Sequence, residues 1–107
     1  MPTDHTALLL RLVGGDPAAA AEVLDLAPAT RSASVLVAAA MLTGDPGHLT
    51  LATDLAGDPR ERRLVVLARV HLDGDDALLD VLVRDHLADH PDHLLAAWIA
   101  GRPSSRP

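Results

Sequence analysis

Three histidines near the C-terminal end of the chain have the residue type and spacing of metal ligands. His86, His90 and His93 lie in the segment RDHLADHPDH, where aspartates are interspersed among them. On an uninterrupted helix the three imidazoles would share one face, and two histidines four residues apart can reach one zinc ion. One candidate function is therefore a small metal-binding protein or metal-dependent enzyme that uses these three side chains.

Pro91 interrupts this segment and favours a second interpretation. The residue before a proline avoids the α-helical region, so we expect the helix to break between His86 and His90 and the shared face to be lost. His86 would then stabilise a helix C-terminus, His90 would help to cap the next helix, and His93 would lie on the surface. In this interpretation the protein holds no metal and no cofactor.

Three arginines form a second candidate site in segment 57–76, GDPRERRLVVLARVHLDGDD. Arg60, Arg62 and Arg63 fall in the first turn of a predicted helix, where acidic residues would be more stable by a few tenths of a kcal/mol each. Guanidinium groups beside a helix N-terminus suit a carboxylate or a phosphate, so the three arginines are candidates for binding an anionic partner. The alternative is a solvated face, because Asp58 and Glu61 lie beside them.

The last apolar segment, DHLLAAWIAG, is predicted to form a helix that is apolar almost all round. The ends of a helical array need polar surfaces, so such a helix predicts another molecule against it. Leu10 and Val37 also fall outside the apolar stripes of their own predicted helices. We therefore expect self-association or an obligate partner, with contacts from Leu94, Leu95, Trp98 and Ile99.

No combination of residues predicts catalysis. The chain lacks cysteine, lysine and tyrosine, so any chemistry would depend on histidine, carboxylates, hydroxyls or arginine. The serines and threonines fit helix caps and helix faces, and neither a glycine-rich phosphate loop nor a G-x-S-x-G sequence is present. We expect a protein that is not an enzyme.

Composition favours one all-α domain with an aliphatic core. The 107 residues include a single aromatic, Trp98, among abundant leucine and alanine, which are strong helix formers. A chain of this length can bury roughly two thirds of its unfolded surface without disulfides or metals. The residue usage, rich in alanine, arginine and glycine, resembles that of a bacterial protein from a GC-rich genome.

Charge and hydropathy restrict the partners. The net charge of −6 argues against binding to nucleic acid, because the cationic face that would neutralise phosphates is missing. No apolar run is long enough to span a bilayer, and the first residues do not resemble a secretory signal. The absence of cysteine is consistent with a reducing compartment, so we expect a cytoplasmic protein with no membrane partner.

Short helices with clear start and stop signals must position these residues. An aspartate before a proline caps the first turn of a helix, and a glycine after the last apolar residue allows the left-handed backbone that ends it. The predicted helices are bounded by Thr3 or Asp4 and Gly14, by Asp16 and Pro28, by Thr30 or Ser32 and Gly44, by Asp45 and Gly57, by Asp58 and Gly74, by Asp75 and the break before Pro91, and by Pro91 and Ala100.

Apolar residues spaced three and four apart predict which side chains of each helix face the core. The segment after Asp58 has the clearest such stripe. The predicted inward residues are Leu8, Leu9, Leu12 and Val13; Ala20, Val23, Leu24 and Ala27; Val35, Leu36, Ala39, Ala40 and Leu42; His48, Leu51, Ala52 and Leu55; Leu64, Leu67, Ala68 and His71; and Leu78, Leu79, Leu82, Val83, His86 and Leu87.

The helix boundaries recur with a regular period. The glycine of a GD pair recurs at Gly15, Gly44 and Gly74, and a helix-breaking proline recurs at Pro28, Pro59 and Pro91. The unit is a helical hairpin of roughly 30 residues, repeated about three and a half times. With its junctions LVGGDP, LTGDP and HLDGDD, this pattern resembles the tetratricopeptide-like class of helical repeats over nearly the whole chain.

The resemblance implies about seven helices in stacked antiparallel hairpins. It also implies a non-enzymatic scaffold that binds another protein, or a second copy of itself, through one face of its helix layer. We expect a single domain over residues 1–101 and a frayed tail over residues 102–107. The alternative is an irregular bundle of seven helices, because GDP-type junctions suit any tight turn between helices.

Overall fold

Seven α-helices make up most of the chain in the computed structural model, which describes residues 5–102. They are α1 (Thr6–Val13), α2 (Pro17–Leu26), α3 (Ala33–Thr43), α4 (Gly47–Leu55), α5 (Pro59–Asp73), α6 (Asp76–Asp89) and α7 (Leu94–Gly101). The described residues contain no strand, so the predicted all-α fold with seven helices is confirmed.

The predicted start and stop signals act at both ends of α5 and at the start of α6, whereas α4 ends at Leu55 rather than at Gly57, whose φ is not positive. The Asp58 carboxylate accepts a hydrogen bond from the Glu61 N–H at 2.8 Å, and Pro59 occupies the first turn of α5. Gly74 ends that helix with a φ of 80°, a left-handed conformation that costs glycine little. Asp75 then caps α6 by accepting from the Leu78 N–H. The cap predicted for the first helix, Thr3 or Asp4, lies outside the described residues.

The core is centred on α3, which is buried on all sides. Every residue from 35 to 41 is buried, because the helix contacts α2, α4, α5 and α7. Val37, which we expected outside the inward stripe, is fully buried. That prediction is wrong because an apolar stripe marks the inward side of a helix that is covered on one face only, whereas α3 is covered on every face.

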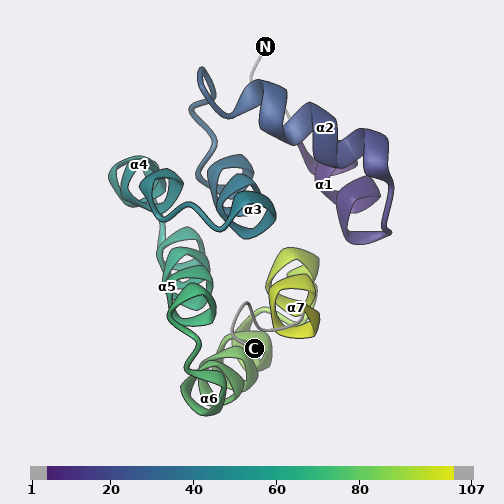
Figure 1. Cartoon of the computed structure of the whole chain (residues 1–107). Coiled ribbons are helices and arrows are strands. Elements are labelled where there is room, and N and C mark those ends of the chain that lie inside the picture. The colour runs from purple at the N-terminus through teal and green to yellow at the C-terminus, as the bar shows by residue number, and fades with distance from the viewer. Residues whose placement is uncertain (1–4, 103–107) are drawn as a thin grey trace.

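The last helix turns back into the molecule. The chain curves from α2 through α3, α4 and α5 to α6, and α7 then lies inside this curve (Figure 1). It contacts α1, α3, α5 and α6, so the first and last helices of the described chain meet. These neighbours explain why α7 is apolar almost all round. Leu95 and Ile99 are buried within the chain, and only Leu94 and the half-buried Trp98 of the predicted contact set keep surface for another molecule.

The predicted stripe of α4 has the wrong phase. In α4 the buried residues are Leu49 and Ala52, whereas Leu51 is 53% exposed and Leu55 also lies on the surface. Helix α4 has only nine residues, and its leucines can be assigned to more than one face. Packing against α3 and α5 selects the face. The other predicted inward residues that prove to be exposed are Leu24 and Leu78.

The segment before α7 is a turn rather than a helix. We predicted a helix from Pro91, but α7 begins at Leu94 and His93 is its N-terminal flanking residue. The Arg102 guanidinium, at the start of the expected tail, lies over the Trp98 ring at 4.7 Å. The rest of that tail, residues 103–107, lies outside the described part of the chain.

Candidate functional site

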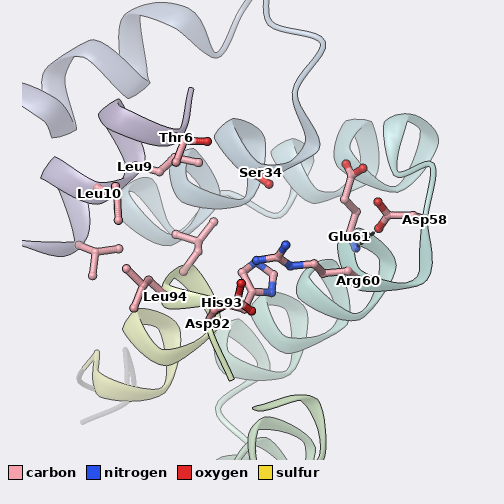
Figure 2. Close-up of a pocket in the computed structure, with 12 residues that line it drawn as sticks. Thr6, Leu9, Leu10, Ser34, Asp58, Arg60, Glu61, Asp92, His93 and Leu94 are labelled. Atoms are coloured by element: carbon pink, nitrogen blue, oxygen red, sulfur yellow. Dashed lines mark hydrogen bonds between the residues drawn. The ribbon is translucent and has the colours of Figure 1, made fainter. Parts of the chain in front are cut away.

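A cleft of about 340 Å³ lies between α1, the start of α5 and the start of α7 (Figure 2). Residues from the two ends of the described chain meet here because α1 and α7 are in contact. The cleft is lined by Thr6, Leu9, Leu10, Val13, Ser34, Asp58, Arg60, Glu61, Asp92, His93, Leu94 and Leu95. One side is apolar and the other is charged.

The apolar side is formed by α1 and α7. Leu10 is 48% exposed and Leu94 is 47% exposed, although both are large aliphatic side chains. Each lines the same cleft, with the half-buried Leu9 and Val13 beside them. Single exposed leucines are common on protein surfaces, but two that share a concave surface form an apolar patch that another molecule could cover.

The charged side is formed by the first turn of α5 and by the turn before α7. Asp58 is held in place by its cap to Glu61. Arg60 extends from α5 toward the His93 imidazole (Figure 2). Within residues 5–102 the Arg60 guanidinium has no ion pair, although Asp58, Glu61 and Asp92 line the same cleft.

His93 is joined to His86 at the base of this charged side. The Nε2 atom of His86 and the Nδ1 atom of His93 are 2.6 Å apart, and the side chains are 1% and 8% exposed. We predicted that the break at Pro91 would separate the histidines and leave His93 on the surface. Both predictions are wrong. The turn between α6 and α7 is so short that the chain folds directly back, which places His93 against the last turns of α6.

Both members of this pair are neutral near pH 7. Burial is the main cause that lowers the pKa of His93 to about 4, and the Arg60 guanidinium lowers it further. Burial also lowers the pKa of His86, with smaller effects from His90, Arg63 and Arg60. A buried imidazolium would have to lose its hydration beside these cations, so the uncharged form is favoured.

His90 completes a cluster of three imidazoles. The His86 ring centroid lies 5.0 Å from that of His90 and 4.9 Å from that of His93. Among residues 5–102, however, no group of three or more histidine, aspartate or glutamate side chains is arranged to hold a metal ion. The bond between His86 and His93 already occupies the two nitrogens that face each other.

The three arginines do not line the cleft together. Arg60 lies in the cleft, whereas the Arg63 guanidinium binds the Asp89 carboxylate of α6 at 2.8 Å. This ion pair holds the pKa of Asp89 below its usual range. Arg62 is exposed and does not line the cleft. Because residues three apart share a helix face, Arg60 and Arg63 lie on one side of α5 and both lower the pKa of His86, whereas Arg62 points elsewhere.

Sequence reasoning missed most of the cleft. Arg60 and Leu94 were identified as candidates, but for two separate surfaces. Asp92 was read only as a member of the histidine segment, and Ser34 as a residue of a helix cap or face. A further signal was the position of Leu10 outside its helix stripe, since that side chain is indeed exposed.

The chain matches no protein-family model, no curated protein and no solved structure. In the described part of the chain, every helix is too short or too polar to cross a lipid bilayer.

Proposed function

We propose that this protein is a non-enzymatic helical scaffold that binds another protein through the cleft between α1, α5 and α7. The observation that carries the proposal is the meeting of Leu10 and Leu94, two half-exposed leucines from opposite ends of the chain, in one concave surface. Apolar side chains bordered by charged groups are the usual composition of a protein-binding patch.

The partner we propose presents an apolar side chain to the leucines and polar groups to α5. A docked aliphatic side chain would cover apolar surface that water now contacts, which is the main driving force of association. The charged rim, with Arg60 on one side, would fix the orientation of the partner. A second copy of this chain is a possible partner, through Leu94 and the half-buried Trp98. Tetratricopeptide-like stacking and a bacterial cytoplasmic origin remain part of this proposal.

A binding role accounts for the cleft better than catalysis does. The only imidazole in the cleft, that of His93, is hydrogen-bonded through Nδ1 to another histidine rather than to a hydroxyl. A general base needs a pKa near the working pH, whereas the pKa of His93 lies at about 4. We therefore propose no catalytic residue.

Affinity capture from the native host with matched variants tests the proposal. Leu94→Asp places a carboxylate in the cleft, and Leu51→Asp makes the same change at a similarly exposed leucine on α4. We expect a specific protein to be captured by the wild type and by Leu51→Asp but lost with Leu94→Asp. If the wild type and both variants capture the protein equally, the cleft is not the surface that binds it. Light scattering on the same variants shows whether the partner is a second copy.

A further inference from the structure

The buried histidine pair determines which atom His93 presents to the cleft. The Nδ1 atom of His86 is fully buried and has no hydrogen-bond partner within the described residues. A buried N–H without a partner is more costly than a buried lone pair, so His86 carries its proton on Nε2. That proton is then donated to the Nδ1 atom of His93, 2.6 Å away.

The proton of neutral His93 must consequently lie on its other ring nitrogen. Nδ1 of His93 acts as the acceptor, so Nε2 carries the hydrogen. Within residues 5–102, Nε2 makes no hydrogen bond and is not among the fully buried atoms that lack a partner, so it keeps contact with solvent. The His93 side chain lines the cleft. His86 therefore makes His93 a hydrogen-bond donor at this point.

We infer that Arg60 and His93 together form a two-donor site for the carboxylate of an acidic side chain next to an apolar residue of the partner. Arg60 extends to the same part of the cleft as His93 and has no ion pair among the described residues (Figure 2). The apolar residue of the partner packs on Leu10 and Leu94. This contact fixes the direction from which the carboxylate reaches the two donors. This inference rests on the proposed function and specifies the chemistry that the cleft recognises.

The carboxylates of the cleft restrict the ligand to a single anionic group. Asp58, Glu61 and Asp92 line the cleft together with Arg60, so its lining is not cationic as a whole. A small multivalent anion would be repelled by all three carboxylates. One carboxylate held by a packed aliphatic residue carries less charge, so it can reach the two donors with less repulsion from the acids. Inorganic phosphate should therefore bind more weakly than a peptide with a single carboxylate.

Two blocked dipeptides test the site on the full chain at neutral pH. N-acetyl-Leu-Glu-amide carries the proposed groups, and N-acetyl-Leu-Gln-amide has the same shape without the charge. In NMR titrations we expect the first to shift the His93 ring and the methyl groups of Leu10 and Leu94, and to bind at least about tenfold more tightly than the second. Nitrogen spectra of the imidazoles should show the proton of His93 on Nε2.

Two arginine variants complete the test. Arg60→Gln should remove the preference for the glutamate peptide, whereas Arg62→Gln, two residues away and outside the cleft, should keep it. Equal binding of the two peptides, no binding of either, or a proton on Nδ1 of His93 would overturn the inference. Capture of a protein that depends on Leu94 would still support the proposed function in that case. Peptide binding without any protein capture would instead contradict the proposed function alone.

Discussion

The imidazoles of His86 and His93 are 2.6 Å apart, although a helix end, a proline and a turn separate them in the sequence. The contact ties the last turns of α6 to the first residue before α7 in a buried environment. A hydrogen bond there is protected from competition with water, so its loss leaves polar atoms unsatisfied. The pair therefore connects the stability of the fold to the shape of the cleft.

Stability should decrease as the pH falls from about 6.5 to about 4. An ordinary histidine has a pKa of 6.5, whereas folding lowers the pKa of His93 to about 4. Between these pH values His93 binds a proton in the unfolded chain but not in the folded chain. The stability present above pH 6.5 is therefore progressively lost as the pH falls. The loss due to His93 is at most about 3.5 kcal/mol, since one pKa unit corresponds to about 1.4 kcal/mol.

Urea unfolding at pH 7.5, 5.5 and 4.5 measures this dependence. His93→Gln should reduce it, with the remainder due to His86, whose pKa is also lowered, whereas His48→Gln, on α4 away from the pair, should keep the wild-type slope. The lowered pKa values of Asp16 and Asp89 affect stability only below about pH 4, outside most of this range. An unfolding free energy that is equal at pH 7.5 and 4.5 would contradict the burial of a neutral His93.

Leu49→Ala and Leu51→Ala should differ widely in stability. Leu49 is fully buried and Leu51 is 53% exposed, although the sequence stripe assigned Leu51 to the core. Truncation of the buried leucine should cost about 2–5 kcal/mol through lost burial and the cavity that remains. Truncation of the exposed Leu51 should change the unfolding free energy by no more than about 0.5 kcal/mol. Chemical denaturation of both variants checks the difference, and the reverse order would mean that α4 is rotated.

Gly44→Ala should destabilise the fold by backbone strain alone. Gly44 ends α3 with a φ of 75°, and a Cβ atom added there would meet nothing within 4 Å. An alanine in this left-handed conformation should cost about 1 kcal/mol or slightly more. Gly57→Ala is the matched control, because its added Cβ also has open space and its φ is not positive. Thermal unfolding that shifts equally in both variants would show that conformation is not the cause.

Zinc should not stabilise the folded protein. Two nitrogen ligands of one tetrahedral zinc ion lie about 3.3 Å apart, given Zn–N bonds of about 2.0–2.1 Å. The His86 and His93 nitrogens are closer, at 2.6 Å, and bind each other directly. Thermal melts of protein made without a histidine tag, with and without equimolar zinc, should coincide. A zinc-dependent rise that disappears in His90→Ala would instead support the metal-binding alternative.

The sequence by itself determined most helix boundaries, although not the start of α7, which lies three residues after the predicted Pro91. Caps such as Asp58 and stops such as Gly74 act between residues a few positions apart, so their effect does not depend on the rest of the fold. The stripe of α5 was also correct, with Leu64 and Leu67 buried as predicted. A fifteen-residue helix has enough turns to define one face, whereas the nine residues of α4 do not.

Only the tertiary structure decided which residues come together at the candidate site. The return of α7 into the curve of the other helices buries Ile99, pairs His86 with His93 and brings Leu94 beside the residues of α1. Each of these contacts joins residues through the packing of several helices at once. Local propensity and periodicity carry no information about such contacts, because the free energy that selects them comes from burying surfaces that are far apart in the chain.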